Sequence, residues 1–161
     1  MLNAEQSAFV RDLYREMYDQ LKGYAYSTLK NESRAEEAVQ EAFQIACQKP
    51  EDLMNSPNPR GWLKKTVKYT AANIRYGIDR DKRLLASFLA TQGSKVAMTE
   101  NRISLEVDYS NIVHLEEYKL LEDKVLKGKS HLEIAEERGI TLVACKKRVQ
   151  RAKEILRKKL K

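Results

Sequence analysis

Apolar side chains recur at three- and four-residue steps over residues 3–29, the spacing of one face of an α-helix. Asn3 and Gln6 stand ahead of this stripe with the spacing of a capping box. The stripe consists of Phe9, Leu13, Met17, Leu21, Tyr24, Ala25 and Leu29. The pattern predicts a first amphipathic helix that buries this face.

Two further helical stripes follow before residue 77. Ser33 and Glu36 again have capping-box spacing, and the second predicted helix ends near Lys49–Pro50. Its inward positions are Ala35, Ala38, Val39, Ala42, Phe43 and Ala46. Residues 53–61 are rich in turn formers, and a third helix begins behind them. Its inward positions are Trp62, Leu63, Val67, Thr70, Ala71 and Ile74. Three such helices enclose one small core.

The helical period is lost between residues 78 and 111, which we expect to form a flexible linker with room for one docking helix. Helical patterns return over residues 112–127, 130–138 and 141–161. Their shared core is predicted from Leu120, Leu121, Leu132, Ile134, Ala135, Ile140, Cys145, Val149, Ala152 and Leu156. The predicted fold class is all-α, with two small helical domains, 1–77 and 112–161, joined by the linker.

The most specific segment is HLEIAEERGITLVACKKRVQRAKEIL, residues 131–156. Ala135 is small where two helices cross, Gly139 permits a tight turn and Ile140 fills it, which is helix-turn-helix spacing. The side chains expected on the outward face of the second helix are Thr141, Lys146, Lys147, Arg148, Gln150 and Arg151. Such donors suit phosphates and base edges of duplex DNA. The alternative is an ordinary basic helix with a solvated face.

Charge supports a nucleic-acid partner. The chain of 161 residues has a formal net charge of +7, and residues 141–161 hold nine basic side chains and one acidic side chain. A second basic block, over residues 53–83, has eight basic and two acidic side chains. Residues 1–52 are acidic in balance, with ten acidic and six basic side chains.

Other functional classes find little support in the sequence. Cys47 and Cys145 form no CxxC pair and are expected to be reduced and structural, while His114 and His131 lack companion ligands. We therefore expect neither a metal, a cofactor nor an enzyme active site. No apolar stretch approaches the roughly 20 residues of a membrane span, and the N-terminus lacks a signal-peptide pattern. We therefore expect a cytoplasmic location and no membrane insertion.

Three segments, taken in order, resemble the extracytoplasmic-function (ECF) group of the sigma-70 family. RAEEAVQEAF (residues 34–43) is similar to a helix of that family's second region, and PRGWLKKTVKYTAANIR (residues 59–75) resembles its promoter-melting segment. SHLEIAEERGIT and KKRVQRAKEILRKKL resemble the helix-turn-helix of the fourth region. The resemblance implies a second-region bundle of three to four helices and a fourth-region domain.

The resemblance also implies a function, that of a sigma factor which binds RNA polymerase core, recognises promoters, melts the −10 element and initiates transcription. An acceptor-rich strip on the second helix is expected to meet the coiled coil of the largest polymerase subunit. This strip comprises Glu37, Gln40, Glu41 and Gln44. An anti-sigma protein is a further partner that the resemblance implies.

For the −10 element, the amide and hydroxyl side chains of the 53–61 loop are expected to bind an unstacked base. Lysines behind the loop are expected to bind the backbone of the single strand, and tyrosines to stack on its bases. The residues predicted for this role are Asn55, Ser56, Asn58, Arg60, Lys64, Lys65, Lys68, Tyr69, Asn73 and Tyr76. Plain turn chemistry is the alternative for the loop residues. Thr141 and the outward side chains of the last helix are expected to bind the −35 element.

The sequence departs from the family pattern at Glu122, Asp123 and Arg138, where apolar residues are usual. These positions predict a C-terminal domain that is marginally stable alone or packs against another surface. Two other functions also fit the sequence. One is a stand-alone helix-turn-helix regulator that binds duplex DNA without polymerase. The other is an RNA-binding, phage or transposon accessory protein that uses both basic blocks on phosphates.

Overall fold

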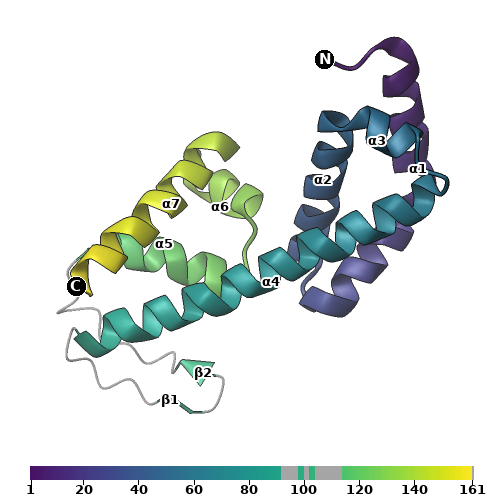
Figure 1. Ribbon diagram of the computed structural model, residues 1–161. Coiled ribbons are helices and arrows are strands. Elements are labelled where there is room, and N and C mark those ends of the chain that lie inside the picture. Colours follow the sequence, from purple (N-terminus) through teal and green to yellow (C-terminus); the bar gives the residue numbers. More distant parts are fainter. Residues whose placement is uncertain (92–97, 100–101, 104–113, 161) are drawn as a thin grey trace. The chain divides into compact units, whose positions relative to one another are not determined.

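The computed structural model describes residues 1–91, 98–99, 102–103 and 114–160 (Figure 1). The helices are α1 (Ala4–Leu29), α2 (Glu32–Gln48), α3 (Pro50–Met54), α4 (Pro59–Thr91), α5 (Leu115–Val125), α6 (His131–Arg138) and α7 (Leu142–Lys159). Two-residue strands, β1 (Met98–Thr99) and β2 (Arg102–Ile103), pair antiparallel. The predicted all-α class is confirmed.

The chain divides into two compact units, residues 1–76 and 77–161. The division falls within α4, so that residues 59–76 of this helix belong to the first unit and residues 77–91 to the second.

The caps of the first two helices explain where each begins. Asn3 and Gln6 form the predicted capping box of α1, since each side chain accepts the other's backbone N–H, at 2.8 and 3.0 Å. The capping box predicted at Ser33 and Glu36 is wrong. Asn31 caps α2 instead, because its extended backbone lets Oδ1 accept the Arg34 N–H at 2.9 Å. Ser33 consequently lies inside the helix.

The first unit has the core that the periodicity predicts. The buried stripes of α1, α2 and the first part of α4 share one hydrophobic cluster, to which α3 adds Leu53. Trp62 and Ile74 pack against its edge. One polar bond crosses the core, from the Thr70 hydroxyl to the Ala38 carbonyl at 2.8 Å, and it satisfies a buried group.

The second unit includes residues that the sequence assigned to the linker. Residues 78–91 continue α4, and Ile78, Leu84, Leu85, Phe88 and Leu89 are buried. Phe88 stacks on Tyr118 of α5, with ring centroids 6.3 Å apart. This part of the chain therefore differs from the predicted linker. Apart from the two strands, the rest of residues 92–113 lies outside the described residues, as do the predicted helix start at 112 and the final Lys161.

Helices α6 and α7 meet at the corner predicted around Gly139. Gly139 has φ 65° and ψ 35°, and the Ile140 N–H donates to the Ala135 carbonyl at 3.0 Å, which closes the end of α6. Thr141 then caps α7 by accepting the Ala144 N–H at 3.1 Å. The predicted core members are buried except for two, and Leu132 is 55% exposed on the first turn of α6. Ile140 is half-buried.

Two of the charged residues that depart from the family pattern, Asp123 and Arg138, pair with each other in the second unit. Arg138 lies 3.6 Å from Asp123, and Asp123 also pairs with Lys127 at 3.1 Å. The pair joins α6 to α5, so a cation and an anion together replace apolar side chains at a partly buried place. Glu122 beside them is 6% exposed.

Within the part of the chain that is described, no helix combines the length and apolar character that crossing a membrane requires.

Candidate functional site

The strip predicted on α2 lies on the surface of the first unit. Gln40 and Gln44 are exposed, and Glu37 and Glu41 are half-buried. The Gln40 amide donates to the Tyr14 hydroxyl at 3.2 Å, which orients it beside α1. The helix thus presents amide and carboxylate groups along one side, as predicted.

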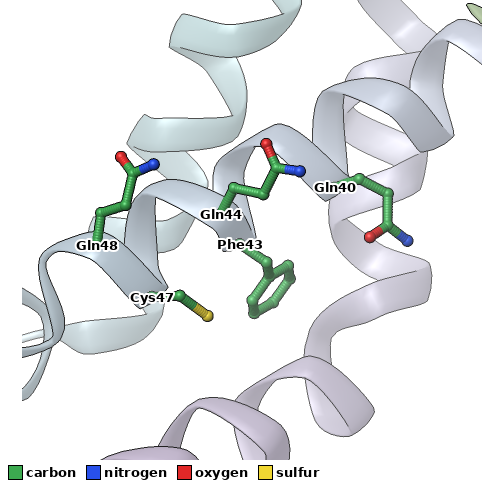
Figure 2. Close-up of a pocket in the computed structure, with 5 residues that line it drawn as sticks. All are labelled: Gln40, Phe43, Gln44, Cys47 and Gln48. Carbon is green, nitrogen blue, oxygen red and sulfur yellow. The ribbon is translucent and has the colours of Figure 1, made fainter. Parts of the chain in front are cut away.

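The strip borders a shallow depression of about 400 Å³, which extends it toward the end of α2. Figure 2 shows its lining, in which three glutamines lie along α2 beside the Phe43 ring and the Cys47 thiol. The lining residues are Gln40, Phe43, Gln44, Cys47 and Gln48. The sequence prediction omitted Cys47 and Gln48. Gln48 could have been predicted, because it lies four residues after Gln44 and therefore on the same face of the helix.

A lysine of α1 pairs with two carboxylates on the first turns of α2. Lys22 reaches Glu32 at 2.9 Å and Glu36 at 3.0 Å. These hydrogen bonds raise the pKa of Lys22 above its usual range, and the same contact lowers the pKa of Glu32. Burial lowers the pKa of Arg34, and the charge of nearby Glu37 opposes that shift. Glu32 and Glu36, the partners of Lys22, lie outside the predicted strip, whose own acidic side chains are Glu37 and Glu41.

The loop between α3 and α4 is built by its own polar side chains. Asn58 caps α4, since its Oδ1 accepts the Gly61 N–H at 3.0 Å, and Ser56 Oγ accepts the Asn58 N–H at 3.2 Å. A Cβ on Gly61 would lie 2.6 Å from Asn58 Nδ2, so any other residue at this position would force the Asn58 side chain to shift. Ser56 and Asn58 thus perform turn chemistry, while Asn55 is exposed beside them.

Arg60 is engaged within the first unit. Its guanidinium forms a two-pronged pair with Glu16 of α1, with both N–O distances 2.9 Å. The hydrogen bonds lower the pKa of Glu16 and raise that of Arg60. Arg60 was predicted to bind DNA, and in this structure it links α1 to α4.

The outward face of α4 holds the remaining side chains predicted for single-stranded DNA. Tyr69 is 61% and Tyr76 65% exposed, a large apolar area for two solvent-facing rings. Lys65, Lys68 and Asn73 are exposed as well, and Lys64 is half-buried. Exposed Arg75 lies on the same face as Lys64 and Lys68, eleven and seven residues further along α4, and sequence reasoning left it out of the predicted set.

Lys64 and Lys68 both lie over the ring of Tyr24 on α1, with Nζ at 5.8 and 5.6 Å from the ring centroid. Sequence reasoning placed Tyr24 on the core stripe, but it is 39% exposed. Its neighbour Ala25 occupies the core position instead. No signal in the sequence connects Tyr24 with lysines forty or more residues away.

The side chains predicted to face outward from α7 lie on its solvent-exposed face. All five predicted side chains beyond the cap are exposed: Lys146, Lys147, Arg148, Gln150 and Arg151. Cys145, Val149 and Ala152 turn inward. Exposed Thr141 has a capping role, which uses one acceptor site of its hydroxyl.

The fold and these faces define an all-α protein with a basic helix face in each of its two units. Residues 13–75 match the family model for Sigma-70 region 2. This match covers the whole α2 strip, the loop and the first part of α4, so this part of the chain is similar to region 2 of the sigma-70 family. Members of that family are transcription initiation factors rather than enzymes, and the match supports such a role in polymerase-directed initiation. No curated protein matches the chain.

Proposed function

We propose that the chain is a sigma factor of the ECF type, which binds RNA polymerase core, opens and reads the −10 element with its first unit and reads the −35 element with its second. The observation that carries this proposal is the region 2 match over residues 13–75, together with a helical corner at Gly139 that presents a basic helix. The protein acts in the cytoplasm, and an anti-sigma protein that covers these faces is a further expected partner.

Polymerase binding is assigned to the α2 strip of Glu37, Gln40, Glu41 and Gln44. Carboxylates on one helix face complement a basic partner helix, here the coiled coil of the largest polymerase subunit. The depression between Phe43 and Cys47 supports this assignment, because an apolar side chain of the partner can enter it while the glutamines hydrogen-bond at its rim.

The −10 element is assigned to the loop before α4 and to the exposed face of that helix. Tyr69 and Tyr76 offer rings for stacking, and Lys64, Lys65 and Lys68 offer charges to a single-stranded backbone. Capture of bases as they unpair requires no ATP. Asn55 and the donor amide of Asn58 are the loop groups suited to an unstacked base.

The −35 element is assigned to α7. A helix that follows a tight turn and carries four basic side chains and one glutamine on its outer face fits the major groove of duplex DNA. Arg151 and Lys147 lie one helical turn apart and are the donors we expect to matter most.

The test of the proposal is polymerase binding by a triple variant, Glu37→Ala, Gln40→Ala and Glu41→Ala. The affinity of the full chain for core polymerase should fall at least about tenfold, because the strip loses both carboxylates and a central amide. The matched control is Asp12→Ala, Asp19→Ala and Gln20→Ala, which likewise removes two carboxylates and one amide, from the exposed side of α1.

The control should bind core polymerase as the unaltered chain does, and both variants should keep the helical circular dichroism of the parent. Equal binding by the triple variant and the parent contradicts the assignment. Tight duplex binding without polymerase, together with no polymerase binding by the parent, would instead favour the stand-alone helix-turn-helix regulator.

A further inference from the structure

The contact between Tyr24 and two lysines is a feature that the proposed function does not explain. Tyr24 belongs to α1, and Lys64 and Lys68 belong to α4, four residues apart on one helix face. Both ammonium groups lie within 6 Å of one ring centroid. This is the range in which a ring quadrupole attracts a cation.

The arrangement brings two like charges together at a surface where no carboxylate pairs with either of them among the described residues. Side chains four residues apart on a helix are neighbours, and like charges at this spacing repel each other. The negative face of the Tyr24 ring offsets part of that repulsion. The result is a small cationic site in which both ammonium groups lie over the Tyr24 ring.

Neighbouring contacts hold Tyr24 in place. Ala25 next to Tyr24 is buried in the core, and the Arg60–Glu16 pair ties α1 to α4 one helical turn before Lys64. Tyr24 is 39% exposed, Lys68 is exposed and Lys64 is half-buried, so solvent reaches this site. The site can therefore accept an anion without a change in the helices.

We propose that Tyr24 is a positioning residue, which holds Lys64 and Lys68 as a paired site for backbone phosphates of single-stranded DNA. The inference rests on the proposed −10 function of the first unit and extends it from α4 to α1. Lysine side chains lose considerable rotamer freedom when they bind a ligand, and ordering them beforehand lowers that cost. Tyr69 and Tyr76 lie further round the exposed face of α4, which leaves stacking on bases to them.

The test measures binding of the full chain to a fluorescent oligothymidylate of about 12 nucleotides, by anisotropy over a series of salt concentrations. Tyr24→Leu should weaken binding about threefold to fivefold, the effect of a cation–π contact at a partly exposed site. Tyr24→Phe keeps the ring and should bind within about twofold of the parent. The conservative variant thus separates the ring from the hydroxyl.

A double-mutant cycle separates positioning from direct stacking. Lys64→Ala with Lys68→Ala should weaken binding and reduce the slope of log affinity against log salt by about 1.4, as expected when two single-strand phosphate contacts are lost. Adding Tyr24→Leu to that pair should cause no further loss, because there are no lysines left to position. Lys158→Ala with Lys159→Ala, a matched loss of two exposed lysines from α7, should leave the Tyr24 effect unchanged.

Three results overturn the inference. The first is an affinity of Tyr24→Leu equal to that of the parent. The second is a loss on adding Tyr24→Leu that is as large in the double lysine variant as in the parent. The third is a loss in Tyr24→Phe as large as that in Tyr24→Leu. Should Tyr24→Leu lower the melting temperature, Tyr24→Gln, which suits an exposed helix position, gives the same comparison. If the parent chain bound no oligothymidylate, the proposed −10 function would fail together with the inference. A loss on removing the two lysines, with no loss on Tyr24→Leu, would refute the inference and leave the proposed −10 function standing.

Discussion

Gly139 shows how one residue sets the geometry of the second unit. Its left-handed backbone lets α6 end and α7 begin within three residues, because an L side chain at φ 65° meets its own backbone. No atom lies within 4 Å of where a Cβ would be placed, so the requirement for glycine comes from the backbone alone. This residue was predictable, because the Ala135, Gly139 and Ile140 spacing is itself a local signal.

Gly139→Ala should lower the free energy of unfolding of the second unit by about 1 kcal/mol, the cost of a left-handed alanine. Chemical denaturation followed by circular dichroism measures it. Gly23→Ala is the matched control, because Gly23 lies inside α1 with no atom near its Cβ position. The control should stabilise the first unit by up to about 1 kcal/mol. Losses in both variants would show that the left-handed turn is not the cause.

Other residues have partners that no spacing in the sequence discloses. Arg60 has the neighbours of a DNA-binding loop, yet its partner Glu16 lies 44 positions earlier. The second capping box failed for a different reason, because Asn31 and Ser33 are both good caps and only the backbone shows which one is extended. Tyr24 likewise owes its proposed role to packing between α1 and α4.

Among the elements, α4 departs furthest from the sequence prediction. Ile78, Leu84, Leu85, Phe88 and Leu89 follow a helical spacing, but the charged run between Asp79 and Arg83 hides the stripe. Asp81 within that run is only 2% exposed. Its Oδ2 lies 2.9 Å from the Nζ of Lys153 on α7, a contact across 72 positions, so the helix could not be recognised from local pattern alone.

The Asp81–Lys153 pair is expected to tie α4 to α7 within the second unit. Asp81→Leu alone should lower the free energy of unfolding of that unit by up to about 3 kcal/mol, since it leaves the Lys153 ammonium group, whose side chain is only 13% exposed, without this partner. Asp81→Leu with Lys153→Met replaces both charges with apolar groups and should restore most of the stability, because Asp81 Oδ1 has no hydrogen-bond partner to lose. Denaturant titration of the three proteins measures this coupling.

An additive result, in which Lys153→Met worsens Asp81→Leu, would contradict the pairing. Asp79→Leu is the matched control, because Asp79 is exposed on the same helix two residues earlier. Its effect should stay within about 0.5 kcal/mol. A control loss as large as that of Asp81→Leu would indicate a general effect of leucine in α4.

At the scale of the whole molecule, the two units divide the proposed work between single-stranded and duplex DNA. The first unit combines exposed rings with lysines, which suits unpaired bases, and the second presents a basic helix after a tight turn, which suits a groove. Helix periodicity predicted both units and most of their cores. The extent of the second unit was not predicted, because residues 77–91 join it through contacts with α5 and α7.

Transcription in vitro tests the central claim most directly. Core polymerase on genomic fragments, with the chain added, should start transcripts at a defined set of sites that core alone does not use. Lys147→Ala with Arg151→Ala should reduce those transcripts at least about tenfold. Lys158→Ala with Lys159→Ala, which removes equal charge from the end of α7, should reduce them less. Transcripts that are the same with and without the chain would contradict the account.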